Sequence, residues 1–320
     1  MHFVPEHPLK RVIIDTDPGI DDAAAILMAL GSPEIQIDAI TTIFGNTPAE
    51  NCTTNTLRIL EAANRTDIPV YQGASRQFNF TVPASASHIH GSDGFGDTGL
   101  PLPEIKPQSG NAILEIIDRA TSAPGEITFV AIGRLTNLAL AISVEPQVAD
   151  ALKEVVVMGG AVHVPGNATP VATANLWGDP EAANVVYSSG ANIVQIGLDV
   201  CNEVEIPLKQ QEIVWAKNTP ATRLLQAITP FKKSPNSKRE GLPSDGGIHY
   251  NDVSAMAYAI DPSLFECTDL NISIETQSEL TRGQAVADFS WSGSKPNTSV
   301  ALKVDSDRLV QIWVERVMRA

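Results

Sequence analysis

Cysteine is scarce in this sequence, and the three cysteines of its 320 residues, Cys52, Cys201 and Cys267, lie far apart. Their odd number and wide spacing exclude both a disulfide framework and a cysteine-rich zinc site. No apolar run approaches the roughly 20 residues that a membrane-spanning helix needs. The first residues also lack the apolar segment of a secretory signal. We therefore expect a cytoplasmic protein with no membrane partner.

Positive charge is scarce as well. The chain carries 22 Lys and Arg against 37 Asp and Glu, which gives a formal net charge of −15. Proteins that bind nucleic-acid backbones use Lys and Arg to displace counterions, so we expect no nucleic-acid partner. One basic stretch, residues 232–239, is interpreted as a solvated loop, or alternatively as a segment that closes over a pocket. The 43% apolar content is typical of a globular protein and excludes a disordered or fibrous one.

Short β-branched runs alternate with helical stretches along the chain. We expect buried strands at residues 11–15, 36–43, 127–132, 154–158 and 192–198, with helices at 21–30 and 48–63. Strands separated by helices indicate a parallel sheet, and their continuous apolar runs indicate that both faces are covered. A late strand at 299–304, with antiparallel pairing as one possibility, precedes a closing helix at 307–318. The pattern predicts an open, mostly parallel, doubly wound (Rossmann-like) α/β sheet in a single domain over residues 1–320.

Three segments rich in Gly, Pro and polar residues are too long to be simple connectors: 73–107, 159–178 and 229–251. Long loops in compact domains tend to be functional or disordered. In open parallel sheets, ligands bind beyond the carboxyl ends of the strands. We therefore expect the functional residues in these loops and in the turn after the first strand.

An acidic cluster follows the first strand and provides the strongest local signal. Asp15, Asp17, Asp21 and Asp22 fall within eight residues that contain no Lys or Arg. Two carboxylates about 4 Å apart repel by roughly 4 kcal/mol at an effective dielectric near 20, and a helix N-terminus offsets only part of this. A divalent cation such as Ca²⁺ or Mg²⁺ would offset it, because both prefer carboxylate oxygens. The alternative is helix capping by Asp21 with the other side chains solvated.

The chain positions of these aspartates suggest different tasks. We expect Asp15, as the last residue of the strand, to bind backbone amides of neighbouring turns. Asp17 is expected to project into the crevice, and the Pro18-Gly19 turn to bring Asp21 and Asp22 back toward it. A carboxylate beside a metal-bound water can orient the water and accept its proton.

The segment Asp15 to Asp22 resembles the signature of the nucleoside hydrolase family, of the inosine–uridine-preferring type. Further segments resemble motifs of this family and follow in the same order along nearly the whole chain. They are residues 45–46, 88–91, 133–139, 157–160 with 166–167, 175–183, and 252 with 255–262.

This resemblance implies an open α/β fold that binds one Ca²⁺ and hydrolyses the N-glycosidic bond of a ribonucleoside to ribose and free base. Asp17 matches the general base, which also contacts the metal; Asp22, Asp252 and the backbone carbonyl of Thr136 match further metal ligands. The family also suggests a homodimer or homotetramer. The residues that match the surroundings of the ribose and its attacking water are Asp21, Asn46, Met158, Asn167 and Asn175.

Two positions depart from the family pattern. Thr173 stands where the family usually has a Glu that grips the ribose 5′-hydroxyl, so this contact is shortened and uncharged. Asn251 stands where the best-known members have a His that assists the leaving base, and an amide cannot donate a proton at ordinary pH. His90 remains a candidate for contact with the base, whereas the direction of the His249 side chain makes it a doubtful substitute.

Three alternatives to a nucleoside hydrolase of the usual kind remain open. The smaller Thr173 leaves room for a 5′-substituted or otherwise modified nucleoside. The two departures are also compatible with a binding protein that keeps the calcium site but has lost turnover. Phosphoryl transfer of the haloacid dehalogenase kind is disfavoured, because that pattern requires Thr or Val where this chain has Gly19.

Overall fold

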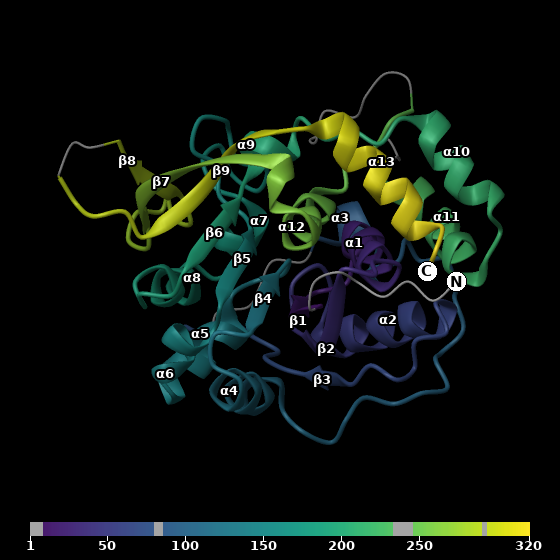
Figure 1. Ribbon diagram of the computed structural model, residues 1–320, viewed down its shortest axis with the longest axis horizontal. Coiled ribbons are helices and arrows are strands. Elements are labelled where there is room, and N and C mark those ends of the chain that lie inside the picture. Colours follow the sequence, from purple (N-terminus) through teal and green to yellow (C-terminus); the bar gives the residue numbers. More distant parts are fainter. Residues whose placement is uncertain (1–8, 80–85, 233–245, 290–292) are drawn as a thin grey trace.

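The computed structural model describes residues 9–79, 86–232, 246–289 and 293–320 (Figure 1). In this part of the chain the strands form one nine-stranded sheet of order β3-β2-β1-β4-β5-β6-β9-β7-β8. Most of the predicted basic stretch lies outside the described residues. The strands are β1 (Lys10–Thr16), β2 (Ile35–Thr42), β3 (Val70–Gln72), β4 (Ile127–Ala131), β5 (Glu154–Met158), β6 (Ile193–Ile196), β7 (Phe265–Ile274), β8 (Ala285–Asp288) and β9 (Thr298–Val304).

β1 to β6 pair in parallel, and β9 pairs in parallel with β6, whereas β7 runs antiparallel to both β9 and β8. β1 lies between β2 and β4, so the chain winds outward from β1 in one direction and then resumes on its other side at β4. Such a reversal of strand order opens a crevice beyond the carboxyl ends of the strands. The turn after β1 therefore lies where ligands bind in sheets of this kind.

Helices cover both faces of the sheet because alternate strand residues point to opposite sides. Val12 and Ile14 pack in one hydrophobic cluster, whereas Ile13 packs in a second cluster on the other face. The first cluster includes residues of α1 (Ile20–Leu30), α2 (Ala49–Ala62), α9 (Leu198–Cys201), α10 (Leu208–Ala216), α11 (Pro220–Lys232), α12 (Asn251–Ile260) and α13 (Ser306–Val317). The second includes residues of α4 (Ala112–Ser122), α5 (Thr136–Val144), α6 (Gln147–Ala151) and α8 (Pro180–Tyr187).

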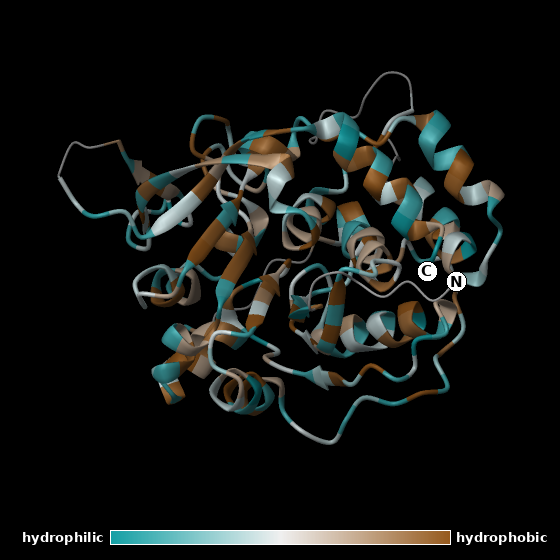
Figure 2. Ribbon diagram, in the orientation of Figure 1, coloured by the Kyte–Doolittle hydropathy of each residue, from teal (hydrophilic) through white to brown (hydrophobic). Residues whose placement is uncertain are grey.

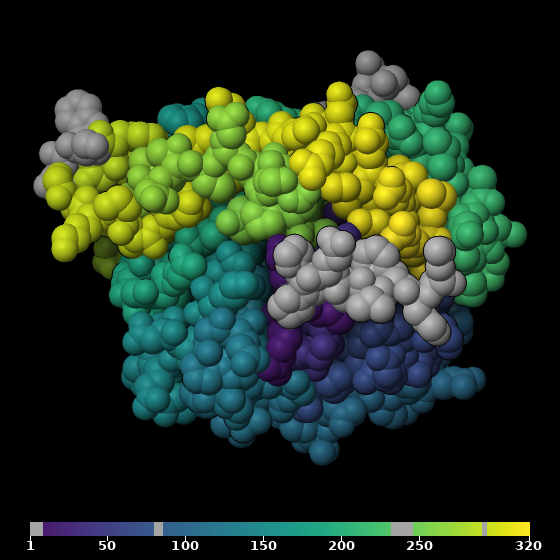
Figure 3. Space-filling model, in the orientation of Figure 1, coloured from purple at the N-terminus to yellow at the C-terminus, as the bar shows by residue number. Residues whose placement is uncertain are grey.

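The remaining short elements are α3 (Ser87–His90), α7 (Ala174–Gly178) and the 3-10 helix η2 (Pro262–Leu264). Figure 2 shows hydrophobic residues running along the central strands, in agreement with their burial on both faces. In Figure 3 the C-terminal elements, in yellow, extend along the upper edge of the molecule from β9 to α13. No helix among the described residues is both long and apolar enough to cross a membrane.

The predicted fold class is confirmed. The strand at 154–158 has the predicted bounds, and the predicted helix at 307–318 corresponds to α13, shifted by one residue. The late strand, β9, pairs antiparallel with β7 but parallel with β6, so the suggested antiparallel pairing describes only one of its two edges. β3, β7 and β8 were not predicted.

Candidate active site

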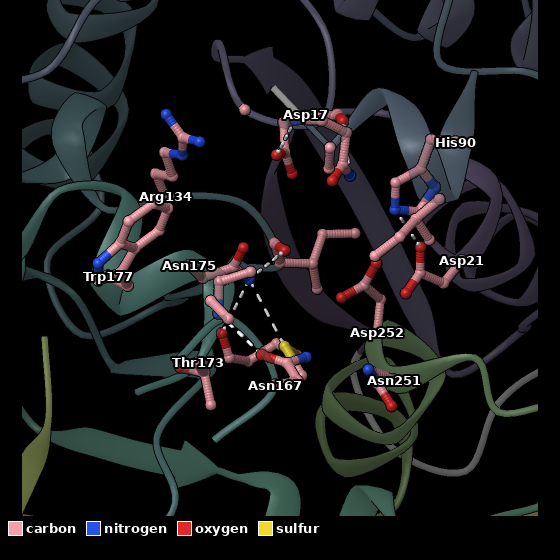
Figure 4. Close-up of a pocket in the computed structure, with 18 of the residues that line it drawn as sticks. Asp17, Asp21, His90, Arg134, Asn167, Thr173, Asn175, Trp177, Asn251 and Asp252 are labelled. Atoms are coloured by element: carbon pink, nitrogen blue, oxygen red, sulfur yellow. Dashed lines mark hydrogen bonds and ion pairs between the residues drawn. The ribbon is translucent and has the colours of Figure 1, made fainter. Parts of the chain in front are cut away.

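A cavity of about 250 Å³ opens at the carboxyl ends of the central strands. Its wall receives Asp17 from the end of β1, Asn46 from the loop after β2, Ile132 from the end of β4 and Met158 from the end of β5. Figure 4 shows Asp17, Asp21 and Asp252 on one side of this cavity, and Thr173, Asn175 and Trp177 on the other. The crevice expected from the strand order therefore contains most of the predicted site residues.

Asp17 is almost completely buried and lines the cavity. Its Oδ2 accepts a hydrogen bond from the backbone N of Asn46 at 2.8 Å, whereas its Oδ1 has no hydrogen-bond partner in the described structure. Burial, followed by the charge of Asp22, raises the pKa of Asp17 well above its ordinary value. A Cβ at Gly45 would lie 1.7 Å from Oδ2, so only glycine fits beside this carboxylate.

Asp22 lies in the first turn of α1 and fixes the turn that follows β1. Its Oδ1 accepts from the Thr16 hydroxyl at 2.6 Å, and its Oδ2 accepts from the backbone N of Gly19 at 2.9 Å and from Asn46 Nδ2 at 3.1 Å. Asp22 rather than Asp21 therefore accepts the hydrogen bond from the backbone N of the Gly19 N-cap. Burial, and then the neighbouring Asp21, raises the pKa of Asp22 to about 6.

A group of three carboxylates from two elements can hold a metal ion. Asp21 and Asp22 belong to α1 and Asp252 belongs to the first turn of α12, and one oxygen of each lies within 4.8 Å of the others. All three residues are buried. The residues present therefore fit an oxygen-coordinated divalent cation, which would offset the repulsion between them. Asp17 lies outside this group but next to Asp22, whose charge raises its pKa.

Thr136 does not lie where the predicted metal ligand should be. It is the first residue of α5, its hydroxyl donates to Asp179 at 2.6 Å, and it is not part of the cavity wall. The neighbouring main-chain oxygen that does lie at the cavity is that of Ile132, which accepts from Asn175 Nδ2 at 2.8 Å. Of these two residues, only Ile132 lines the cavity.

The wall opposite the carboxylates is built from amide and hydroxyl side chains. Asn175 Nδ2 donates to the carbonyls of Ile132 and Met158, which fixes the direction of the amide (Figure 4). Asn167 Oδ1 accepts from the backbone N of Ala174 at 2.9 Å. Thr173 is buried, and its hydroxyl oxygen accepts from the backbone N of Gly160 at 2.9 Å. These groups can bind the hydroxyls of a sugar.

The three residues considered in relation to the leaving base, His90, Asn251 and His249, are arranged differently from one another. His90 Nδ1 accepts from the backbone N of Ile20 at 3.1 Å, which leaves the proton on Nε2, 3.8 Å from Asp21 Oδ1. Asn251 lines the cavity beside Asp252 (Figure 4). His249 does not line it, and its Nδ1 lies 2.9 Å from the carbonyl oxygen of Val204.

Two site residues were missed from the sequence. Arg134, inside the recognised 133–139 motif, is buried in the cavity wall with its guanidinium 4.6 Å from the centre of the Phe44 ring. Burial lowers the pKa of Arg134. Nearby negative charges raise it in part, and that of Asp17 has the largest effect among them. Asn137 in the same motif donates to Asp15 Oδ1 at 2.8 Å. Both residues lie in the 133–139 motif, but the family resemblance gives a role to Thr136 alone.

Comparison with known proteins agrees with this geometry. The profile of the inosine–uridine preferring nucleoside hydrolase family matches residues 12–311. The chain is 37% identical to a probable uridine nucleosidase 2 of Arabidopsis thaliana, over 97% of this chain and 98% of that protein. It is also 37% identical to an inosine–uridine preferring nucleoside hydrolase of Leishmania major, with the same two coverages. Among solved structures, a plant nucleoside hydrolase aligns with a TM-score of 0.90 and 36% identity, over 97% of this chain and 99% of that one.

Fold and site together define a hydrolase that acts on nucleosides at the crevice of a doubly wound sheet. The chain belongs to the inosine–uridine preferring nucleoside hydrolase family. It is an N-ribosylhydrolase, an enzyme that uses water to cleave the bond between ribose and base.

Proposed function

We propose that this protein catalyses calcium-dependent hydrolysis of the N-glycosidic bond of ribonucleosides, with Asp17 as the general base. One observation carries the proposal: the buried carboxylates of Asp21, Asp22 and Asp252 converge within 4.8 Å beside Asp17. A divalent cation would offset the repulsion among these three carboxylates, and a ribose diol can complete its coordination shell.

Asp22 and Asp252 would be the main ligands of the ion. Asp17, which lines the same cavity, would contribute from outside this group, and the Ile132 carbonyl would serve as the main-chain ligand in place of that of Thr136. When bound, the ion supplies Lewis-acid chemistry, which lowers the pKa of water and holds the sugar. Ca²⁺ suits this carboxylate and carbonyl ligand set, because it is a hard cation that tolerates irregular geometry.

Asp17 accepts the proton of the water that attacks the anomeric carbon. Asn46 keeps the Asp17 carboxylate aligned. Its backbone N donates to Asp17 Oδ2, and its side-chain amide donates to the Asp17 carbonyl and to Asp22 Oδ2. As the bond to the base breaks, positive charge develops on the sugar, and the surrounding carboxylates stabilise it. Asp21, Asn167 and Asn175 bind the ribose hydroxyls, with Met158 packed against the sugar.

The identity of the base is suggested by the relatives, whose names mention uridine and inosine. A 5′-substituted nucleoside remains the alternative, because Thr173 is small and already accepts a hydrogen bond from Gly160. Likewise, the homodimer or homotetramer and the cytoplasmic location stay predictions.

The experiment that tests the proposal is ribose release from uridine, inosine, 5′-deoxyuridine and uridine 5′-phosphate, with and without a calcium chelator. We expect hydrolysis of the plain nucleosides, its loss on chelation and its return with Ca²⁺. Asp17→Asn should lower kcat by about 10²–10⁴-fold, while Asp269→Asn, an exposed aspartate on β7, should not change it. Activity that survives chelation, or an undiminished Asp17→Asn enzyme, would contradict the proposal.

A further inference from the structure

A departing nucleobase must gain a proton, because the anion of an unsubstituted purine or pyrimidine is a poor leaving group. The imidazole of histidine is the side chain best suited to supply a proton near neutral pH. In the described part of the chain, the cavity wall carries two imidazoles, His88 and His90, both on α3. The position of each ring determines which of the two histidines can donate a proton to the leaving nucleobase.

The buried imidazole, His90, is committed to the amino end of α1. Its Nδ1 accepts from the backbone N of Ile20, and its Nε2 points toward Asp21 Oδ1 at 3.8 Å (Figure 4). A Cβ at Gly19 would lie 2.5 Å from Nδ1, so the ring is closely held. His90 therefore helps position α1 and Asp21, on the ribose side of the cavity.

The exposed imidazole, His88, is the one available for chemistry. It lines the cavity, and neither of its ring nitrogens has a hydrogen-bond or ion-pair partner among the described residues. The adjoining Ile89 gives this wall an apolar surface, and the Trp177 ring lies on the opposite side from α3 (Figure 4). A planar base fits between an aromatic wall and an apolar one.

We propose that His88 is the acid that protonates the leaving base. This inference rests on the proposed function and gives this chain a proton donor where Asn251 cannot act. In the step, the electron pair of the bond between the anomeric carbon and the base nitrogen goes to the base. The His88 imidazolium donates its proton to the base, while the water oxygen bonds to the anomeric carbon and gives a proton to Asp17, which releases it to solvent after the products leave. Because His88 is exposed, its ring regains a proton from solvent.

The decisive experiment compares two substrates that differ in their need for an acid. Uridine or inosine requires protonation of its base, whereas 4-nitrophenyl riboside releases a stable anion that does not. For His88→Gln we expect kcat on the nucleoside to fall by about 10²-fold or more, KM to change little, and kcat on the nitrophenyl riboside to stay within about threefold.

His163→Gln provides the matched control, because His163 is exposed, stacks on Phe289 and does not line the cavity. It should leave both substrates unaffected. An equal loss on both substrates in His88→Gln would overturn the inference, because it would indicate damage to the ribose or water site. Undiminished nucleoside turnover in His88→Gln would overturn it as well. A wild-type enzyme that cleaves neither substrate would instead contradict the proposed function.

Discussion

Asp15 and Asp17 are two positions apart in the sequence but serve different purposes. Asp15 is completely buried, and its Oδ1 accepts from the Thr41 hydroxyl at 2.5 Å and from Asn137 Nδ2 at 2.8 Å. These bonds join β1 to β2 and α5. Asp15 therefore fixes the carboxyl end of β1, from which Asp17 reaches the cavity. We expected backbone amides to bind the Asp15 carboxylate. Instead, the hydroxyl of Thr41 and the side-chain amide of Asn137 bind it.

The protonation of Asp15 predicts a pH effect on stability. Burial raises the pKa of Asp15 from 3.8 to about 7, so between these values the native state holds a proton that the unfolded chain has lost. The free energy of unfolding therefore falls as pH rises through this window, and the loss is complete above about pH 7. Asp15→Asn keeps an acceptor for Thr41 and Asn137 without a charge. Relative to wild type, it should gain about 1–3 kcal/mol between pH 5 and pH 8.

Urea unfolding of both proteins at the two pH values, in chelator, measures this difference. If the free-energy difference between Asp15→Asn and wild type is the same at pH 5 and pH 8, Asp15 does not titrate as its burial implies.

Residue chemistry alone identified the acidic cluster, because crowded carboxylates without cations are conspicuous in any sequence. Side-chain partners were harder to foresee. Thr136 donates a hydrogen bond to Asp179, which is 43 positions away, and no local sequence pattern predicts this bond. The pairing of His90 with the amino end of α1 likewise joins segments 70 positions apart. Sequence reasoning therefore indicated which residues gather at the site, but not which of them are occupied by structural contacts.

At the scale of elements, α12 delivers Asp252 to the site, and α13 holds α12 in place. The residue before the first turn of α12 is Tyr250, whose hydroxyl lies 2.7 Å from that of Thr229. The Tyr250 ring lies 5.9 Å from that of Trp313, which is fully buried on α13. The position of a metal ligand thus depends on an aromatic contact made by the last helix.

Trp313→Ala should therefore destabilise the protein and weaken cation binding together. Removing a buried Trp leaves a cavity that costs about 3–5 kcal/mol, and the indole N–H has no hydrogen-bond partner in the described structure, so the loss is one of packing. Denaturant unfolding and calcium titration measure the two effects. Leu114→Ala on α4, where the side chain is 63% exposed, should change neither. Calcium affinity unaltered in Trp313→Ala would show that α12 keeps its place unaided.

Elements with continuous apolar runs were predictable, and those without were not. Three strands are buried along most of their length: β1, β4 and β5. Their sequences are rich in β-branched residues, which predicts buried strands. β7 is exposed at four consecutive positions and carries Glu266 and Asp269, so its sequence lacks the pattern of a strand. Its place in the sheet comes from pairing with β9, a contact between distant segments.

At the scale of the whole molecule, the acidic cluster links metal binding to stability. A ligand that binds only the folded state stabilises it by about 2.7 kcal/mol when its concentration is 100 times Kd. We expect Ca²⁺ to raise Tm by several degrees relative to chelated protein, because the ion offsets repulsion among Asp21, Asp22 and Asp252. Calorimetry with chelator and with excess Ca²⁺ measures this shift.

Asp252→Asn should greatly reduce the calcium-dependent shift in Tm, while Asp269→Asn on the exposed surface of β7 should preserve it. An equal shift in both variants would mean that Ca²⁺ acts elsewhere on this protein, whose net charge is −15.

The position of β9 between β6 and β7 also has a consequence during translation. β6 is complete when residue 196 has been added and can pair with β5, but β9, its partner on the other edge, begins only at residue 298. The growing polypeptide therefore leaves the ribosome with an unpaired strand edge, which can template association between nascent chains. A premature stop before residue 298 would make that edge permanent, so truncated products of this gene should be recovered in aggregates.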